Sequence, residues 1–201
     1  MLTISIVTLT CLISIPAFTR TDLFEKLCLY PYLMHRDKKQ WFRMVSVGFV
    51  HADFMHLLFN MLTLYFFGSV LEQKIFGEVQ FLLFYFSALV LSCADEYVKQ
   101  KDNPAYRACG ASGAVAAIMF SLVLFQPWGV VYLKFIIPVY FILFAIGYLI
   151  YSWYMDRRGG QLIGHGIHLW GALYGIAFTL LTKPISLSVF VYEVMHPPFL
   201  K

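Results

Sequence analysis

Three short blocks of the sequence combine residues that can perform acyl transfer with glycines that let helices approach closely. They run from His51 to Asn60, from Gly110 to Gly113 and from His168 to Gly175. Each lies within or beside a long apolar stretch, where polar and ionisable side chains are costly and usually face a cavity or a partner. The polar members of these blocks are therefore the candidates for a functional site.

Ser112 and His168 are the candidates for a nucleophile and its base. Taken alone, an intramembrane serine is more often a helix-packing residue, and a histidine often only bonds within a bundle. A histidine within hydrogen-bonding reach can, however, activate an otherwise weak hydroxyl nucleophile. No carboxylate or lysine lies in the apolar stretches near either residue. A Ser-His dyad therefore fits better than a triad or a Ser-Lys pair.

Small residues around this pair predict that the two helices pack closely. Gly110 and Gly113 bracket the serine, while Gly171 and Gly175 follow the histidine at i+3 and i+7 and share its helix face. Such faces let two backbones approach each other. Their contact would bring the hydroxyl and the imidazole within hydrogen-bonding distance.

Acyl transfer also needs donors for the oxyanion, and the first block supplies two. His56 and Asn60 are one helical turn apart and share a face. Each can donate an N–H toward a common point, and the backbone N–H of Ser112 is a third candidate donor.

The elements that must position these residues are membrane helices. The chain has 201 residues and is 60% hydrophobic, 18% aromatic and only 13% charged, unlike a soluble domain. Its apolar runs are continuous, which favours spanning helices of about 20 residues over a barrel. We predict an all-α membrane protein, a six-transmembrane-helix bundle in a single domain over residues 1–201. The predicted spans are residues 2–19, 54–71, 79–98, 111–128, 135–155 and 163–182.

The connections carry the remaining polar residues. No basic residue precedes Arg20, so the first apolar stretch is interpreted as a retained helix rather than a secretory signal. The long connection from Arg20 to Val50 mixes charges with aromatic rings and is expected to lie partly in the membrane interface. The turn from Asp156 to Gly164 is either a mobile cap or a plain solvated turn. The run from Pro184 to Tyr192 is too short to cross and is expected to form a tail.

Two further features limit the possible functions. The four cysteines show no CxxC spacing and are interpreted as packing residues. The net charge of +4 is modest and scattered through the connections, which suits anionic headgroups and argues against nucleic acid as a partner.

In combination, the three blocks resemble the rhomboid intramembrane serine proteases. The recognisable elements of that family are a His-x4-His-x3-Asn block, a Gly-x-Ser-Gly block and a His-x2-Gly-x3-Gly block, and all three occur here in order. The resemblance covers essentially the whole chain. It includes an aromatic-Arg element at Phe42 and Arg43 in the long first connection, and Glu72 at the end of the second span.

The resemblance implies that Ser112 is the nucleophile and His168 the general base and then acid, with His56 and Asn60 stabilising the oxyanion. It implies structural roles for the three other motif residues, which are His51, Arg43 and Glu72. It implies no metal and no cofactor. The expected partners are the lipid bilayer and single-span membrane proteins, which enter past a mobile fifth helix and under a cap. The expected location is multi-pass in the plasma or inner membrane.

The sequence departs from the family pattern at one position near the nucleophile. Relatives often carry an aromatic ring four residues after the serine, stacked on the catalytic histidine, where this chain has Ala116. His168 must then be oriented by another residue, with Trp153, Tyr174 and His165 as the candidates.

The membrane orientation depends on which signal is followed. Lys and Arg concentrate in the first, third and fifth connections, so the positive-inside rule predicts a cytoplasmic first connection. The resemblance places that connection outside. We follow the resemblance, because a connection folded into the interface is a poor case for counting charges.

Two alternative functions belong to other classes. A proteolytically inactive, derlin-type relative would bind membrane clients without cutting them, but the presence of both Ser112 and His168 argues against it. A metal or haem carrier would use the histidines, but they come without carboxylate or thiolate ligands, and an HExxH motif is absent.

Overall fold

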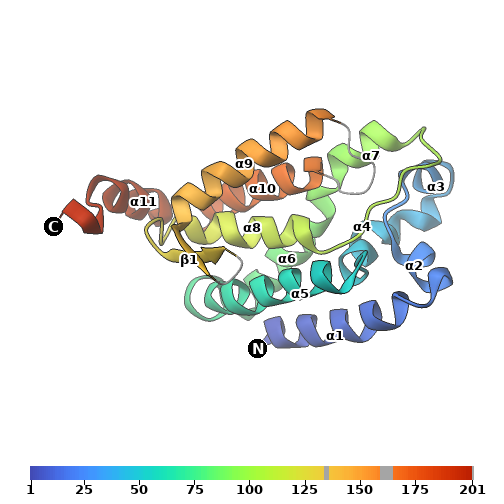
Figure 1. The fold of residues 1–201 in the computed structure, drawn as a ribbon, viewed down its shortest axis with the longest axis horizontal. Helices are drawn as coiled ribbons and strands as arrows, with labels where there is room; N and C mark the ends of the chain where they lie inside the picture. Colours follow the sequence, from blue (N-terminus) through green and yellow to red (C-terminus); the bar gives the residue numbers. More distant parts are fainter. Residues whose placement is uncertain (134–135, 159–164, 201) are drawn as a thin grey trace.

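The computed structural model describes residues 1–133, 136–158 and 165–200 and shows a mostly helical protein (Figure 1). The longer helices are α1 (Leu2–Ala17), α5 (Phe54–Thr63), α6 (Glu78–Ser92), α8 (Ser112–Val123), α9 (Phe141–Arg158), α10 (His165–Thr182) and α11 (Ile185–Met195). The shorter helices are α2 (Thr21–Leu27), α3 (Pro31–Arg36), α4 (Arg43–Ser46) and α7 (Ala94–Gln100), with 3-10 turns at Lys38–Phe42, Val47–Phe49 and Pro198–Leu200. Two π-helical segments, Leu64–Gly68 and Leu71–Phe76, extend α5. Strands β1 (Val130–Leu133) and β2 (Ile137–Tyr140) form an antiparallel hairpin.

Helix α8 forms the centre of the bundle. Every residue from Gly113 to Val123 is buried, and α6, α9 and α10 pack around it. The sequence of α8 is small and apolar on all sides, as expected of a helix with no exposed face. The predicted nucleophile is the first residue of this central helix.

The apolar helices overlap the predicted spans in sequence. Two of them, Phe54–Phe76 and Glu78–Gln100, are long and apolar enough to cross a membrane. A third candidate is the pair Gly166–Thr182 and Ile185–Met195, which is bent by 112°. Shorter apolar helices lie at the three remaining span positions, namely Leu2–Ala17, Ser112–Val123 and Phe141–Tyr151. The described residues thus hold an apolar helix at each of the six positions, and two or three of these elements meet the length of a full span.

The long first connection is folded rather than extended. It contains α2, α3 and α4, and Arg43 is its buried centre with 5% of its surface exposed. The Arg43 guanidinium donates to the backbone oxygens of Glu25 at 2.7 Å and Cys28 at 2.8 Å. These charge-assisted bonds satisfy carbonyls at the end of α2. The aromatic rings of Trp41 and Phe42 stay about half exposed.

Glu72 ties α1 to the end of the α5 helix. Its carboxylate is buried and accepts from the backbone N–H groups of Leu2 at 2.7 Å and Thr3 at 2.8 Å, and from the Thr3 hydroxyl at 2.5 Å. These donors belong to the first turn of α1, where backbone N–H groups have no partner within the helix. Glu72 therefore stabilises the start of α1 as a helix cap with negative charge.

A hairpin precedes α9, so this helix begins at Phe141 rather than at residue 135. Val130 of β1 pairs with Tyr140 of β2. The first N–H groups of α9 donate to the turn after α8, with Phe141 N–H bonded to Gly129 O at 2.7 Å and Ile142 N–H to Pro127 O at 2.8 Å. These bonds give partners to N–H groups of the first turn of α9, which have none within the helix. The helix can therefore begin at Phe141, and the residues just before it form strand β2.

The C-terminal run, which was expected to form a tail too short to cross the membrane, is an 11-residue helix. Helix α11 follows α10 after a two-residue break at Lys183 and Pro184 and points away from the bundle (Figure 1). The indole N–H of Trp128 donates to Glu193 O at 2.7 Å and so ties α11 to the turn between α8 and β1.

Candidate active site

Ser112 lies at the start of α8 because of the backbone before it. Gly110 has φ +112°, a conformation that side-chain-bearing residues rarely adopt. Its N–H donates to Val47 O at 3.0 Å, which holds the segment against the first connection. The chain then enters α8, where the N–H of Ser112 belongs to the first turn and has no partner within the helix. The serine thus presents a hydroxyl and a backbone N–H at one place.

His168 on α10 meets this hydroxyl directly. Its Nε2 atom lies 2.7 Å from Ser112 Oγ, and both residues are partly buried. When Ser112 donates its proton in this bond, Nε2 is the acceptor and the imidazole proton is on Nδ1. This is the geometry that a base requires to activate a hydroxyl.

Glycines on α10 let the two helices approach closely enough for this bond. A Cβ added at Gly171 would lie 2.8 Å from the carbonyl carbon of Gly113, and one at Gly175 would lie 2.7 Å from Ala117 Cα. Real Cβ atoms essentially never come nearer than 3.0 Å to another heavy atom. The backbones of α8 and α10 are therefore in contact along the face that carries His168.

His56 and Asn60 lie on α5, and His56 is in contact with the segment that leads into Ser112. The His56 ring covers Gly110, where an added Cβ would lie 2.8 Å from His56 Nε2. Asn60 is buried, and its side-chain amide donates to His56 O at 2.8 Å. An amide carries two N–H groups, so this bond uses one of its two donors. Asp53 caps α5 by accepting from His56 N–H at 2.8 Å.

His51 joins three segments behind the site. It is fully buried, and its Nε2 accepts from Ala111 N–H at 3.3 Å. Its Nδ1 lies 2.9 Å from Ser14 Oγ of α1, and this hydroxyl donates to Phe49 O. The bonds specify a neutral ring with its proton on Nδ1. Burial, with a smaller contribution from His56, lowers the pKa of His51 to about 3, in agreement with a neutral ring.

Among the described side chains, Tyr148 of α9 packs on His168, and the sequence did not predict this contact. The two ring centroids are 6.0 Å apart. Of the expected candidates, Tyr174 bonds to Ser87 Oγ at 2.5 Å and Trp153 is 48% exposed, while the side chain of His165 lies outside what the structure describes. A signal was present in the sequence, since Phe141, Phe144 and Tyr148 recur along one face of the fifth helix.

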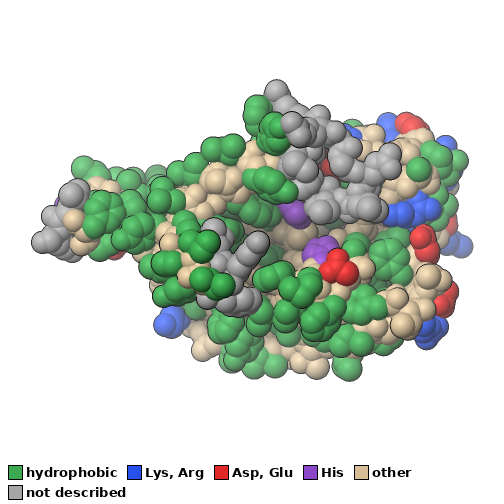
Figure 2. All heavy atoms as spheres, in the orientation of Figure 1, with side chains coloured by type: hydrophobic (Ala, Val, Ile, Leu, Met, Phe, Trp, Pro, Cys, Tyr) green, Lys and Arg blue, Asp and Glu red, His purple; other side chains and the backbone are tan. Residues whose placement is uncertain are grey.

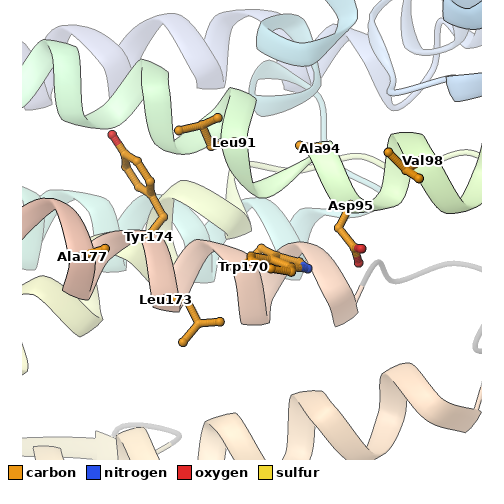
Figure 3. Close-up of a pocket in the computed structure, with 8 residues that line it drawn as sticks. All are labelled: Leu91, Ala94, Asp95, Val98, Trp170, Leu173, Tyr174 and Ala177. Atoms are coloured by element: carbon orange, nitrogen blue, oxygen red, sulfur yellow. The ribbon is translucent and has the colours of Figure 1, made fainter.

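The described residues include two apolar grooves next to α8 or α10. One, of about 530 Å³, lies between α10 and the α6–α7 segment, with Leu91, Asp95, Trp170 and Leu173 among its lining residues (Figure 3). It lies on the face of α10 turned away from Ser112 and is therefore separate from the candidate site. The other, of about 520 Å³, lies between α5 and α9 and is lined largely by aromatic and aliphatic side chains, among them Phe59, Phe66, Met119, Tyr132 and Phe144.

The remaining predicted residues either have other contacts in the fold or fall outside the residues that the structure describes. Arg43 and Glu72 are away from Ser112 and hold the first connection and α1. Most of the predicted cap, from residue 159 to residue 164, lies outside the described residues. Within residues 1–133, 136–158 and 165–200, no three His, Cys, Asp or Glu side chains gather as metal ligands would. The face drawn in Figure 2 is mainly hydrophobic, with most of its charged side chains at the end that carries α2, α3 and α7, and with histidines and an acidic side chain near its middle.

Comparison with known proteins identifies the class to which this fold and site belong. Residues 38–185 match the Rhomboid domain, and the chain belongs to the rhomboid family. Over 91 residues it is 34% identical to the rhomboid protease GlpG of Haemophilus influenzae. The aligned residues make up 45% of this chain and 44% of that protein. Over 145 residues it is 31% identical to RHOMBOID-like protein 12, mitochondrial, of Arabidopsis thaliana. The aligned residues make up 64% of this chain and 43% of that protein.

A third relative is the presenilin-associated rhomboid-like protein, mitochondrial, of Mus musculus. The chain is 31% identical to it over 139 residues, which is 66% of this chain and 36% of that protein. The chain therefore spans less than half the length of the curated relatives it matches. These relatives establish a rhomboid membrane protein.

Proposed function

We propose that this chain is an intramembrane serine endopeptidase in which Ser112 is the nucleophile and His168 is its base and then its acid. The observation that carries the proposal is the 2.7 Å separation between Ser112 Oγ and His168 Nε2. Membership of a family that includes a protein named rhomboid protease supports it.

The reaction follows from this pair. Ser112 Oγ attacks the carbonyl carbon of the scissile peptide bond while its proton passes to His168 Nε2. A C–O bond forms, and the carbonyl oxygen takes the negative charge. His168 then gives the proton to the leaving nitrogen as the C–N bond breaks, which leaves an acyl-enzyme. Water then attacks the carbonyl carbon of the ester, with His168 again acting as base and then as acid, and the carboxylic acid is released.

The oxyanion is stabilised by donors from α5 and α8. We assign this role to His56, Asn60 and the backbone N–H of Ser112. His56 lies against Gly110, two residues before the nucleophile, and Asn60 is one turn along the same face. The loss of one such donor typically lowers kcat by about 10²- to 10³-fold. A partly enclosed, apolar setting strengthens these bonds, because the local dielectric constant is low.

The substrates are transmembrane segments of single-span membrane proteins. In this proposal residues 1–201 form one membrane domain with six spans, at the positions of the six apolar helices. The groove between α5 and α9 is apolar and reaches α8 at Met119, two turns from Ser112, so it can admit an apolar helix from the lipid. We place the protein in the plasma or inner membrane as a multi-pass protein.

The test is labelling and cleavage with purified, reconstituted protein. A fluorophosphonate should label the wild type covalently and should not label Ser112→Ala or His168→Ala. A panel of single-span substrates should be cut by the wild type only, with the cut sites mapped by mass spectrometry. Equal labelling of wild type and Ser112→Ala would refute the nucleophile assignment. Binding of the panel without any cleavage by the wild type would favour the derlin-type function.

A further inference from the structure

Cys28 and Cys109 come from distant parts of the sequence and lie on opposed backbone segments. Their neighbours Leu29 and Ala108 form an isolated antiparallel bridge. Leu29 N–H donates to Ala108 O at 2.9 Å, and Ala108 N–H donates to Leu29 O at 3.2 Å. Two residues that exchange both bonds form a hydrogen-bonded pair, and the next opposed pair is a non-hydrogen-bonded one. That next pair is Cys28 and Cys109.

The backbone of Cys28 confirms its place in the non-hydrogen-bonded position. Its φ and ψ of −62° and 155° are extended. Its N–H donates to Phe24 O at 2.9 Å and its carbonyl accepts from Arg43 at 2.8 Å, so both groups point away from Cys109. In this position the opposed Cα atoms are about 4.5 Å apart, and the side chains are close. Disulfides need Cα atoms about 4.4–6.8 Å apart, so the backbone suits such a bond.

The surroundings of the two thiols agree with close contact. Cys28 is fully buried in a small cluster with Ala17 and Val50, and the partly exposed Cys109 packs against the same cluster. Burial, with smaller contributions from Cys28 and Asp53, raises the pKa of Cys109 to about 12. The other two cysteines are elsewhere, Cys11 on α1 and Cys93 between α6 and α7.

We propose that Cys28 and Cys109 are a disulfide-forming pair that links the first connection covalently to the segment leading into Ser112. Both cysteines are free thiols in the structure. The link would lie three residues before the nucleophile and one residue before Gly110. It would fix the end of α2 to the segment around Gly110 that leads into α8.

The bond forms by exchange with a low-molecular-weight disulfide such as oxidised glutathione. The Cys109 thiolate, the more accessible of the two, attacks one glutathione sulfur, and the first glutathione thiolate leaves. The Cys28 thiolate then attacks Cys109 Sγ and displaces the second. The two cysteines lose two electrons and two protons in total, and one glutathione disulfide becomes two glutathione thiols.

The test uses the full chain in lipid vesicles, treated with oxidised glutathione, alkylated with N-ethylmaleimide and digested with trypsin. The sequence places each cysteine on a separate tryptic peptide, namely residues 1–20, 27–36, 75–99 and 108–134. We expect a linked species of residues 27–36 and 108–134, lighter than its two parts by two hydrogen atoms, that disappears under a reductant. Recovery of Cys28 and Cys109 only as alkylated residues or separate glutathione adducts overturns the proposal.

Variants separate this pair from the other thiols. The double variant Cys11→Ser and Cys93→Ser should keep the link, whereas Cys28→Ser should lose it and leave Cys109 as a glutathione adduct. After oxidation, the wild type should have a Tm about 5 °C or more above that of Cys28→Ser, because the link restricts a long loop in the unfolded chain. An oxidised wild type with the linked peptide but no rise in Tm relative to Cys28→Ser would contradict the clamping role. These readouts do not depend on peptidase activity.

Discussion

The ring of Tyr148 on α9 packs against the ring of His168 on α10, with the two planes at 34°. The same tyrosine contacts Phe120 of α8 at 5.9 Å and Phe144 of α9 at 6.0 Å between ring centroids. Ala116 is buried and small, which leaves room beside His168 for a ring from another helix. An aromatic group absent from α8 at this position is thus supplied by α9.

Replacing Tyr148 should lower cleavage without removing either member of the dyad. We expect Tyr148→Ala to reduce kcat by about 10- to 100-fold, since small misplacements of a catalytic group cost rates of this order. Tyr148→Phe keeps the ring and should retain most of the activity. Tyr151→Ala, three residues along α9 and 56% exposed, is the matched control. Measurement of kcat, KM and the pH profile of kcat/KM on one single-span substrate tests this. Equal losses for the Ala and Phe variants would rule out ring packing as the cause.

The contact between Gly171 and Gly113 should not tolerate even one added methyl group. Gly171→Ala would press its Cβ on the backbone of α8, and we expect the free energy of unfolding to fall by about 1–3 kcal/mol. Gly147→Ala on α9 is the control, because nothing lies within 4 Å of the added Cβ. This control should be neutral or up to about 1 kcal/mol more stable. Unfolding in mixed micelles measures both, and equal stability of the two variants would contradict the close packing.

His51 should make stability depend on pH on the acid side. Burial and the neighbouring His56 lower its folded-state pKa to about 3, whereas an unfolded histidine has a pKa of about 6.5. Below pH 6.5 the unfolded chain binds a proton that the folded chain does not bind, so stability falls as the pH falls toward 3. The slope from this one group approaches about 1.4 kcal/mol per pH unit.

The non-titrating variant His51→Gln should remove that part of the slope, although it lowers stability at pH 7. His196→Gln, at the end of α11, is the control for the loss of a histidine elsewhere. Unfolding free energies at a series of pH values between 7 and 4 measure the effect. A profile for His51→Gln parallel to that of the wild type would show that His51 is not the group responsible.

Neutralising Glu72 should loosen α1. Its three bonds to Leu2 and Thr3 are made by a charged acceptor in a buried place, and Glu72→Gln cannot accept all of them. We expect a loss of about 1.5–3 kcal/mol in the free energy of unfolding. Glu78→Gln removes a carboxylate whose side chain is 65% exposed and should change stability little. Hydrogen exchange on α1 would show whether the loss is local to that helix.

The sequence was sufficient to predict the helical class and the location of the apolar helices. Continuous apolar runs have one stable form in lipid, so composition alone specifies helices there. It also predicted which faces of α8 and α10 meet, because Gly113, Gly171 and Gly175 recur at helical spacing and small residues permit backbone contact.

The features that were missed depend on contacts between distant segments. The hairpin before α9 forms because Phe141 and Ile142 bond to the turn after α8, and no local pattern shows those partners. Tyr148 was overlooked for the same reason, since its neighbour His168 is on another helix. The link between His51, Ser14 and Ala111 likewise joins three segments whose approach only the fold reveals.

The 112° bend between α10 and α11 has a consequence for depth in the membrane. When α10 crosses the bilayer, a helix nearly perpendicular to α10 lies along the bilayer surface. His168 is near the opposite end of α10, 14 residues from Thr182. At about 1.5 Å per residue, the proposed membrane placement would put the imidazole about 21 Å from that surface. In a hydrocarbon core about 30 Å thick, that depth would be within reach of water from the other side.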